Sequence, residues 1–511
     1  MSIHQVLVLI LIQLVIVLLP SIGLSKLFEK AGVAAWKAYI PFYNTWVMLE
    51  LAQRPKHWVF WQFIPLVGWF ISLGIFVEFV KTFGKYRLWE HAMASLLPLI
   101  YFPLIGFDPK VTFLGPDQVK KHKKGVAREW IDAGVFAIVA ATLIRTFVFE
   151  AYTIPTGSME KTLLINDFLF VSKFSYGPRI PNTPLSIPFV HNTLPVTNGN
   201  SYVEWIKIPY TRWFASPVKR GDVVVFNFPA GDTVINLPEY QSLVTYYDVA
   251  RAKGNGDIDA GRPSVLEDPD AFPLVIRPVD KKENYIKRCV GIAGDTLQIK
   301  DQVVYIDGKA QTFPPESQTD YIVEINSQQQ LDENVMKEEY NLDMNNPQEM
   351  RTAGVPNQYL MLLTWAAHEK MLRNGLAKKI TPDMDGDLAV YPYVRSYNWT
   401  RDNYGPIWIP ARGKTLPLTA QNYPLYQRAI RVYEGNKFEM KEGKFYLNGQ
   451  PVTQYTFKMN YYWMMGDNRH GSQDSRYWGF VPEDHVVGEA WLIWMSWNKG
   501  VRWNRLFNTI K

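Results

Sequence analysis

Residues 130–149 read WIDAGVFAIVAATLIRTFVF, and residues 152–163, shortly after them, read YTIPTGSMEKTL. The first stretch is apolar except for Asp132 and Arg145, and it approaches the roughly 20 residues that an α-helix needs to cross a bilayer. The second stretch interrupts this pattern with a small, tightly turned Pro-Thr-Gly-Ser element. We therefore expect a membrane helix that ends just before a separate domain, near Pro155.

The amino-acid composition differs on the two sides of this boundary. The chain has 511 residues, of which 47% are hydrophobic, so its length allows several domains. Before Pro155 the sequence holds long apolar runs, whereas after it apolar residues alternate with Gly, Pro, Asn and charged residues. The pattern predicts N-terminal transmembrane helices followed by a mainly-β domain with α/β insertions.

Three further apolar runs precede this helix: Met1 to Leu24, Trp58 to Val80 and Ala92 to Phe107. The first begins without basic residues and no Ala-x-Ala site follows it, so we interpret it as a retained anchor rather than a cleaved signal peptide. The third is short and carries Pro98 and Pro103, which leaves open a short span, a re-entrant piece or an interfacial hairpin. We therefore expect two or three spans in this region.

The segment from Asp108 to Arg128 is the densest short basic stretch beside any of these runs. Positive charge next to a span stays in the cytoplasm, so the bulk of the chain beyond Phe149 is expected outside. The net charge of +6 comes largely from such juxtamembrane clusters, which suit a surface of anionic lipid. The sequence shows no nucleic-acid motif, and we expect no nucleic-acid partner.

Short β-rich runs bounded by Gly, Pro or Asp occur throughout the second part of the chain. Two stretches there, 296–309 and 437–450, resemble each other, and each contains an Asp-Gly or Asn-Gly pair that predicts a hairpin. Between them lies an insertion of more helical character. The domains that we expect are a membrane region with a basic cytoplasmic loop at 1–128, a transmembrane anchor at 129–150, the two parts of a β domain at 151–316 and 419–511, and an inserted subdomain at 317–418.

The turn after Pro155 places a serine at the start of the β domain. Gly157 leaves the backbone N–H of Ser158 unobstructed, so an attacking hydroxyl and an oxyanion donor share one turn, with the Thr156 hydroxyl as a second donor. The same residues also suit an ordinary Ser/Gly loop after a helix. A serine hydroxyl is a poor nucleophile until a base takes its proton, so this turn needs a base nearby.

Lys287 is the candidate base. A lysine can serve only where burial lowers its pKa from about 10.4, because an apolar site disfavours the charged amine. Lys287 lies in the β-rich run 285–292, whose alternation directs Tyr285, Lys287 and Cys289 to one face. A lysine on a solvated strand edge is the alternative interpretation.

Other chemistries have less support. Ser158 and Lys161 match the S-x-x-K pattern of penicillin-binding proteins, which makes Lys161 a rival base, but the S-D-N and K-T-G partners of that pattern are absent. Cys289 is the single cysteine, which excludes an internal disulfide and a Cys-based zinc site. His368-Glu369 does not continue to HExxH. We expect neither a metal site nor a cofactor.

A further segment, from Met464 to Phe480, is dense in small polar groups and ends on aromatic residues. It can hold the surroundings of a lysine rigid, with the Ser472 hydroxyl offered to the Lys287 amine and Asp474 paired with Arg476. Taken alone, it also suits an ordinary polar turn ahead of an aromatic strand.

Together these segments resemble the bacterial type I signal peptidases, a family of membrane-anchored serine proteases with a Ser–Lys dyad. The resemblance rests on four motifs in the family's order, directly after a membrane run: Ile154-Pro-Thr-Gly-Ser-Met, Arg220-Gly-Asp-Val-Val-Val-Phe, Tyr285-Ile-Lys-Arg-Cys-Val-Gly-Ile-Ala-Gly-Asp, and Gly466-Asp-Asn-Arg through Asp474-Ser-Arg. It implies a signal-peptidase-like β fold. It also implies that the chain removes N-terminal signal peptides from exported preproteins after small residues (Ala-x-Ala) through an acyl-enzyme.

The resemblance implies a role for each motif residue. Ser158 would be the nucleophile and Lys287 the general base, with Thr156 and the Ser158 N–H as the oxyanion hole. Three residues would support this pair. Ser472 would orient the lysine, and Asp474 and Arg476 would form a structural ion pair. Shallow apolar substrate pockets would be lined by Ile154, Met159, Leu163, Tyr285 and Ile286.

The same resemblance implies a place in the bacterial cytoplasmic (inner) membrane, with the catalytic domain on the extracytoplasmic side. The implied partners are signal peptides of exported preproteins and the lipid bilayer, and an association with the export machinery is left open.

Two competing classes of protein are a related Ser/Lys self-cleaving regulator and a catalytically silent membrane scaffold. The membrane runs and the missing DNA-binding module oppose the first, and cleavage of a preprotein would exclude the second.

Three features depart from the family pattern. Lys161 replaces the usual proline after the nucleophile, His470-Gly471 replaces an Asp-Asn pair, and Cys289 stands where a small residue is usual. None of them removes a catalytic role, and Cys289, two positions from Lys287, predicts sensitivity to thiol reagents.

Overall fold

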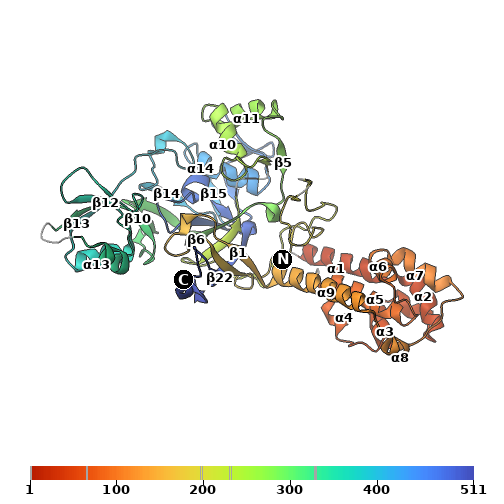
Figure 1. The fold of residues 1–511 in the computed structure, drawn as a ribbon. Coiled ribbons are helices and arrows are strands. Elements are labelled where there is room, and N and C mark those ends of the chain that lie inside the picture. The colour runs from red at the N-terminus through yellow and green to blue at the C-terminus, as the bar shows by residue number, and fades with distance from the viewer. Residues whose placement is uncertain are drawn as a thin grey trace. The chain divides into compact units, whose positions relative to one another are not determined.

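The structure is a computed structural model that describes residues 3–64, 67–195, 197, 199–229, 231, 233–326 and 331–510. The chain divides into two compact units (Figure 1). The first consists of Met1–Val148 and Pro178–Trp213, and the second of Phe149–Gly177 and Phe214–Lys511. Parts of the predicted apolar runs at 1–24 and 58–80 and of the insertion at 317–418 lie outside the described residues.

The first unit is a set of helices around an aromatic core. Phe28, Phe76, Phe79 and Phe102 are fully buried, and their rings contact one another edge-on or stacked. Two helices approach closely at Gly23, where an added Cβ would lie 2.0 Å from the Phe102 carbonyl carbon. The helices are α1 (Ile3–Leu18), α2 (Ser21–Lys30), α3 (Tyr43–Leu51), α4 (Trp58–Trp61), α5 (Val67–Lys81), α6 (Leu88–Leu96), α7 (Pro98–Phe107), α8 (Pro116–Lys121) and α9 (Val126–Phe147).

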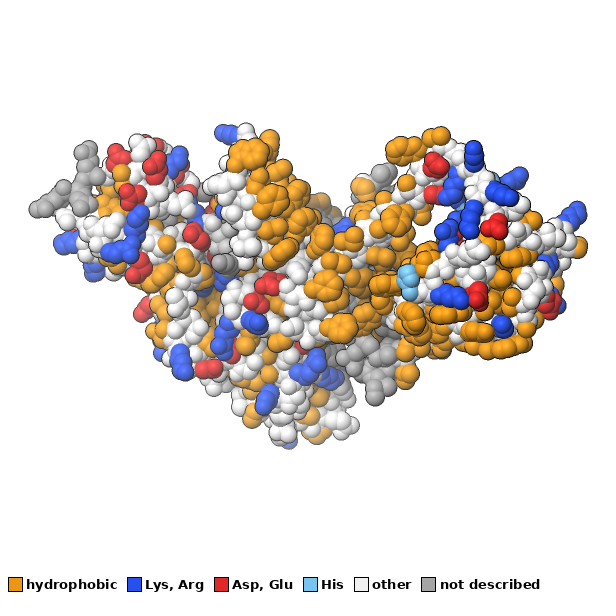
Figure 2. All heavy atoms as spheres, turned by 90° about the horizontal axis from the view of Figure 1, so that it is seen from below, with side chains coloured by type: hydrophobic (Ala, Val, Ile, Leu, Met, Phe, Trp, Pro, Cys, Tyr) orange, Lys and Arg blue, Asp and Glu red, His pale blue; other side chains and the backbone are white. Residues whose placement is uncertain are grey.

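One helix among the described residues is by itself long and apolar enough to cross a membrane. This helix, α9, has 22 residues and forms from the predicted run at 130–149. Its large apolar side chains, such as Trp130 and Phe136, are exposed, as suits a helix surrounded by lipid. Hydrophobic side chains cover much of the visible surface of the helical unit (Figure 2).

The other apolar runs form shorter or bent helices. The α1 and α2 helices meet at 47° and α6 and α7 at 119°, so each pair reaches spanning length only as a broken span or a re-entrant loop. The break between α6 and α7 falls at Leu97, because Pro98 disfavours helical backbone in the residue before it. The predicted run from Trp58 to Val80 forms α4 and the 15-residue α5 rather than one long helix.

The second unit is built on an antiparallel sheet with the strand order β1-β2-β22-β3-β6-β20-β21, and β23 pairs with β22. All residues of β3 are buried, so the centre of this sheet is covered on both faces. The β6 strand, which carries Lys287, lies between β3 and β20. The strands are β1 (Phe149–Thr153), β2 (Asp167–Ser172), β3 (Val223–Asn227), β6 (Asn284–Gly291), β20 (Tyr461–Met465), β21 (Val481–Pro482), β22 (Val486–Ser496) and β23 (Asn508–Thr509).

The two similar stretches form hairpins, as predicted. Their tight turns, Asp307-Gly308 and Asn448-Gly449, have positive φ at both residues, the geometry that favours these residue pairs. The first hairpin belongs to a sheet of β14 (Tyr404–Trp408), β7 (Thr296–Lys300), β8 (Val303–Ile306) and β9 (Lys309–Ala310). The second is the sheet of β16 (Phe438–Lys441), β17 (Lys444–Leu447) and β18 (Gln450–Val452), and β15 (Thr415–Pro417) pairs with β19 (Gln454–Thr456).

The predicted insertion falls into two parts. Its first part has its own sheet and its own core, which includes Val323, Met336, Leu363 and Met371. The later part instead packs into the core of the main β domain. The elements of the first part, here called the inserted subdomain, are β10 (Gln318–Ile325), α12 (Glu333–Tyr340), β11 (Met350–Thr352), β12 (Gln358–Thr364), α13 (Trp365–Arg373) and β13 (Ala377–Pro382).

A smaller helical hairpin lies between β3 and β6 in the chain. Its helices cross closely at Gly261, where an added Cβ would lie 1.8 Å from the Ala250 carbonyl oxygen. Tyr246, Ala250 and Val265 join Ile235 in a small core. The elements are β4 (Thr233–Ile235), α10 (Tyr246–Lys253), α11 (Ile258–Leu266) and β5 (Leu274–Ile276).

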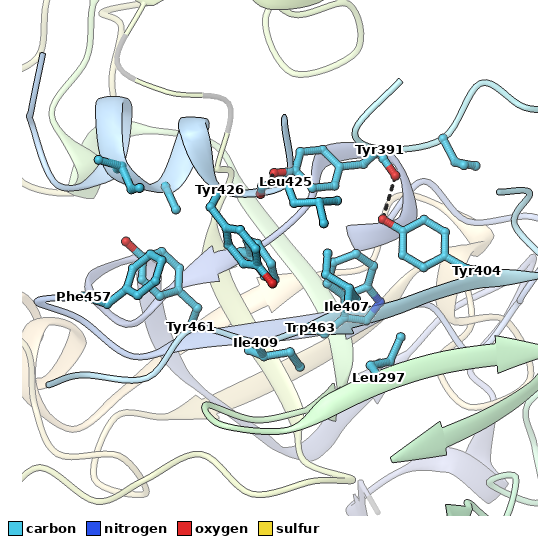
Figure 3. Close-up of a cluster of buried hydrophobic side chains, with 14 of the residues drawn as sticks. Leu297, Tyr391, Tyr404, Ile407, Ile409, Leu425, Tyr426, Phe457, Tyr461 and Trp463 are labelled. Carbon is cyan, nitrogen blue, oxygen red and sulfur yellow. Dashed lines mark hydrogen bonds between the residues drawn. The ribbon is translucent and has the colours of Figure 1, made fainter. Parts of the chain in front are cut away.

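Residues of β20 pack in a large aromatic core (Figure 3). Trp463 of β20 is fully buried there with Tyr404 and Tyr461. The Tyr404 hydroxyl donates to the Tyr391 carbonyl at 2.7 Å, which satisfies a polar group inside this core. The core therefore fixes the strand that leads directly into the polar segment after Met465.

Candidate active site

Ser158 lies in a single 3-10 turn, Gly157–Met159, after Thr156 in extended backbone. The fully buried Met159 fixes one end of the turn. Asn468 holds its backbone, because the Asn468 side-chain amide donates to the Gly157 carbonyl at 3.0 Å and the Asn468 N–H to the Ser158 carbonyl at 3.2 Å. Thr156 is exposed at the start of the turn.

Lys287 reaches Ser158 from the neighbouring strand. Its Nζ donates to the Ser158 Oγ at 2.7 Å and to the Ile286 carbonyl at 2.9 Å. The residue is only 3% exposed, and burial lowers the pKa of the amine to about 8, although Asp474 and Asp467 act in the opposite direction. A considerable fraction of this lysine is therefore neutral in mildly alkaline solution and able to accept the serine proton.

The rival lysine points to another part of the molecule. Lys161 donates to the Asn341 carbonyl at 2.9 Å and pairs with Glu349 at 3.3 Å. Both partners belong to the inserted subdomain. Lys161, which stands in place of the usual proline, thus joins the loop that carries Ser158 to that subdomain.

The polar segment after β20, Gly466–Arg476, is here called the closing segment. The structure confirms the predicted pair inside it: the Arg476 guanidinium donates to Asp474 at 2.9 and 2.8 Å, and both side chains are buried. Burial alone would raise the pKa of Asp474, but the Arg476 charge and the hydrogen bonds to the carboxylate lower it. The Gly466 N–H also donates to Asp474, at 3.1 Å.

The absence of a side chain at Gly466 allows the closest approach in the site. An added Cβ there would lie 2.2 Å from the Ser472 Oγ and 2.5 Å from the Ser158 carbonyl oxygen. Ser472 and the Ser158 carbonyl therefore both lie close to Gly466. Its hydroxyl donates to the Gln473 carbonyl at 3.4 Å, whereas the sequence predicted an interaction with Lys287.

A second buried ion pair was not predicted from the sequence. Arg288, next to the candidate base, donates to both oxygens of Asp467 at 2.8 and 2.6 Å. The Thr162 hydroxyl donates to the same carboxylate at 2.7 Å. The partner of Asp467 lies far away in the chain, so no local sequence pattern indicates this pair.

Lys161 and His470, two residues that differ from the family pattern, both contact the region between residues 317 and 418. The imidazole of His470 lies between the carboxylates of Asp320 and Asp402, at 2.8 and 2.9 Å. Burial lowers the pKa of this histidine, but its hydrogen bonds to the two carboxylates outweigh that effect and raise the pKa above its ordinary value. Lys161 and His470 therefore both connect the site to the chain between residues 317 and 418.

Four of the five predicted pocket residues contact one cluster. Ile154, Met159 and Leu163 are buried together, and Ile286 packs against them. Tyr285 belongs to a different cluster, and its ring centre lies 5.5 Å from the Lys287 Nζ. Tyr285 therefore packs beside the Lys287 amine but outside the cluster of Ile154, Met159 and Leu163.

Cys289 is fully buried, and its thiol contacts the Gly291 carbonyl at 3.5 Å. Burial raises the pKa of the Cys289 thiol well above its ordinary value. A buried, protonated thiol is unreactive, so this environment argues against the predicted sensitivity to thiol reagents. Among the described residues, no group of three His, Cys, Asp or Glu side chains could hold a metal ion.

Comparison with known proteins gives two family matches. The model of the family "Signal peptidase, peptidase S26" matches residues 127–364 and 453–497, together more than half of the chain, including Ser158, Lys287 and the closing segment. A second model, of a family of unknown function (DUF5684), matches residues 36–116 in the helical unit.

Similar proteins include several named Signal peptidase I. The protein from Buchnera aphidicola subsp. Acyrthosiphon pisum is 25% identical over 377 residues, which cover 72% of this chain and 77% of the relative. That from Haemophilus influenzae is 25% identical over 74% of this chain and 75% of its own length. That from Rickettsia massiliae is 29% identical over 38% of this chain and 48% of its own length. With these relatives and the family match, the chain belongs to the peptidase S26 signal peptidases and is a signal peptidase I, a serine endopeptidase.

Proposed function

We propose that Ser158 is the nucleophile and Lys287 the general base of this signal peptidase. The observation that carries this proposal is the 2.7 Å contact between the Lys287 Nζ and the Ser158 Oγ, made by an amine that the fold buries. An exposed lysine would be an ammonium at neutral pH, which cannot accept a proton. Burial supplies the neutral amine that the reaction requires.

The reaction is acyl transfer in two steps. Neutral Lys287 takes the Ser158 proton while the oxygen attacks the scissile carbonyl, and the Ser158 N–H and the Thr156 hydroxyl stabilise the oxyanion. The lysine then gives this proton to the leaving amine, the C–N bond breaks and an acyl-enzyme remains. In the second step Lys287 activates a water molecule, which releases the signal peptide and restores the serine.

The supporting residues act through position rather than contact with the substrate. Asp474 and Arg476 hold the closing segment, and Gly466 lets it reach the nucleophile turn. Ser472, which lies beside Gly466, limits the freedom of the closing segment there. Small displacements of a nucleophile lower catalytic rates sharply, so this rigidity matters for the reaction.

The apolar pocket supports cleavage after small residues. Ile154, Met159 and Leu163 are already buried against one another, so the space between these side chains is filled. An alanine side chain needs little room there, whereas a larger side chain would have to displace packed atoms. We therefore propose that the enzyme cleaves exported preproteins at Ala-x-Ala sites.

The start of the catalytic unit supports a membrane location. The α9 helix ends at Phe147 and β1 begins at Phe149, so the sheet follows the helix almost directly. We propose that α9 crosses the cytoplasmic membrane, with the basic segment before it in the cytoplasm and the catalytic unit outside. A signal peptide anchored in the same bilayer would present its cleavage site at this surface.

Cleavage of a preprotein by the full-length chain in detergent tests the dyad. Wild-type protein should release a shortened product, Ser158→Ala and Lys287→Ala should release none, and Thr156→Val should lose about 10²–10³ in rate. Lys161→Ala is the matched control for a lysine near the nucleophile, and it should retain cleavage. Near-normal processing by Lys287→Ala would contradict the proposal.

A further inference from the structure

His470 lies where three parts of the catalytic unit meet. It belongs to the closing segment, and its side chain is only 6% exposed. Its Nδ1 lies 2.8 Å from a carboxylate oxygen of Asp320, which belongs to β10 of the inserted subdomain. Its Nε2 lies 2.9 Å from a carboxylate oxygen of Asp402, which precedes β14 of the main β domain. The reaction described above uses none of these three residues.

The two carboxylates favour a charged ring between them. A neutral imidazole carries one N–H and can donate to one carboxylate, whereas an imidazolium donates to both. The hydrogen bonds to the carboxylates raise the pKa of His470, although burial and the nearby Arg401 guanidinium act in the opposite direction. Arg401 is itself paired with Asp385 at 2.8 Å. The His470 imidazolium therefore ties the closing segment to two other parts of the catalytic unit.

A backbone contact joins the closing segment to the same strand of the inserted subdomain. Gln318 lies two residues before Asp320 on β10, and its N–H donates to the Asp467 carbonyl at 2.8 Å. The Gln318 carbonyl accepts from the Arg469 N–H, also at 2.8 Å. These two bonds lie on either side of Asn468, which pairs with Gln318 in a parallel bridge. The position of Asn468 thus depends on the contact between β10 and the closing segment.

Asn468 extends this contact to Ser158. Its N–H donates to the Ser158 carbonyl and its side-chain amide to the Gly157 carbonyl. The Gly471 N–H donates to the Asn468 Oδ1 at 3.2 Å, which fixes the direction of the amide. An added Cβ at Gly471 would lie 2.4 Å from the Asn468 Nδ2, so this glycine leaves the room that the amide needs. Because Gly471 follows His470 directly, a fixed His470 also fixes the partner of the amide.

We propose that His470 is a positioning residue for the cleavage reaction. It ties the closing segment to the inserted subdomain and thereby holds Asn468 against the turn that carries Ser158. The inference rests on the proposed role of Ser158 as the nucleophile. Loss of the tie should leave Ser158 misaligned in part of the molecules, and small misalignments lower catalytic rates sharply.

Substitution of Asp320 tests the tie and leaves the buried ring in place. With the full-length protein in detergent and a peptide that carries one Ala-x-Ala site, Asp320→Ala should lower kcat about tenfold and leave KM unchanged. Asp320→Asn should keep kcat near the wild-type value. Its side-chain amide can donate to a neutral His470 ring, whose other nitrogen still donates to Asp402.

Glu324 provides the matched control on the same strand. The side chains of Asp320 and Glu324 are 33% and 30% exposed. Glu324 pairs with Lys378 at 2.8 Å, within the inserted subdomain. Glu324→Ala should therefore keep the wild-type kcat. Equal kcat values for Asp320→Ala and Glu324→Ala would overturn the proposal.

A double variant tests whether Asp320 acts through Asn468. Asn468→Ala should also lower kcat, because it removes the bond to the Gly157 carbonyl. The double variant Asp320→Ala/Asn468→Ala should be no slower than Asn468→Ala alone, since both changes remove the same support. Losses that multiply would show that Asp320 acts by another route, which would also overturn the proposal.

The outcomes separate the role of His470 from the dyad. A wild-type kcat in Asp320→Ala, or an equally low kcat in Asp320→Asn, would overturn the positioning role. Either result leaves the dyad standing as long as Ser158→Ala is inactive on the same peptide. Cleavage by Ser158→Ala would instead remove the basis for both.

Discussion

The burial of Lys287 weakens the fold, and in the proposed mechanism the same burial supplies the neutral amine. Burial lowers the pKa of its amine to about 8, whereas an unfolded lysine titrates near 10.4. Between these two values the unfolded chain binds more protons than the native protein, so the free energy of unfolding rises with pH across this window. Below pH 8 the native enzyme instead carries a charged amine in an apolar site.

Removing this amine should therefore stabilise the protein. Lys287→Met should raise the free energy of unfolding at pH 7 by about 2 kcal/mol while abolishing cleavage. Lys161→Met is the control, because Lys161 is paired with Glu349 and its loss should give no stabilisation. Denaturant unfolding of both variants in detergent measures the effect, and a Lys287→Met protein no more stable than wild type would count against a buried, costly lysine.

The elements of the site are joined by one carboxylate. Asp467 in the closing segment accepts hydrogen bonds from Arg288 of β6 and from Thr162 in the loop that carries Ser158. The strand with Lys287, the loop with Ser158 and the closing segment are thereby linked through a side chain with no exposed surface. Loss of this carboxylate would leave Arg288 buried without a counter-charge.

Replacement of Asp467 should therefore cost far more than replacement of a similar carboxylate at the surface. Asp467→Asn should lower the free energy of unfolding by about 3 kcal/mol or more and reduce cleavage. Asp259→Asn breaks a comparable two-bond pair with Arg431, but Asp259 is 56% exposed at its side chain, so the cost should stay below about 1 kcal/mol. Unfolding of the two variants under one condition measures the difference, and equal costs would contradict a linking role for Asp467.

At the scale of the whole molecule, features encoded locally were predictable from the sequence. The helix after Val126, the Asp-Gly and Asn-Gly hairpins and the burial of Lys287 in a β-rich strand each depend on residues close together in the chain. Features that depend on distant residues were not predictable. Examples are the pairing of Arg288 with Asp467 and the bond from Lys161 to Glu349, each between segments that only the fold brings together.

The predicted membrane runs show the same limit. Hydropathy identified the apolar runs, but it does not report where a helix bends. The division of the run from Trp58 to Val80 into α4 and α5 was not predicted, whereas Pro98, beside the break at Leu97, had left a hairpin or a re-entrant piece open. The interaction of Ser472 with Lys287 was likewise inferred from a motif, whereas the position of Ser472 beside Gly466 depends on the missing side chain there.

The pH dependence of cleavage tests the central claim most directly, namely that a buried lysine amine accepts the Ser158 proton. With the amine pKa lowered to about 8, kcat/KM of the wild-type enzyme should rise about tenfold per pH unit at lower pH and level off above pH 8. Lys287→Ala should show no such rise because it should not cleave at all. A wild-type profile that is flat across this range, or that falls as pH rises toward 8, would contradict the account.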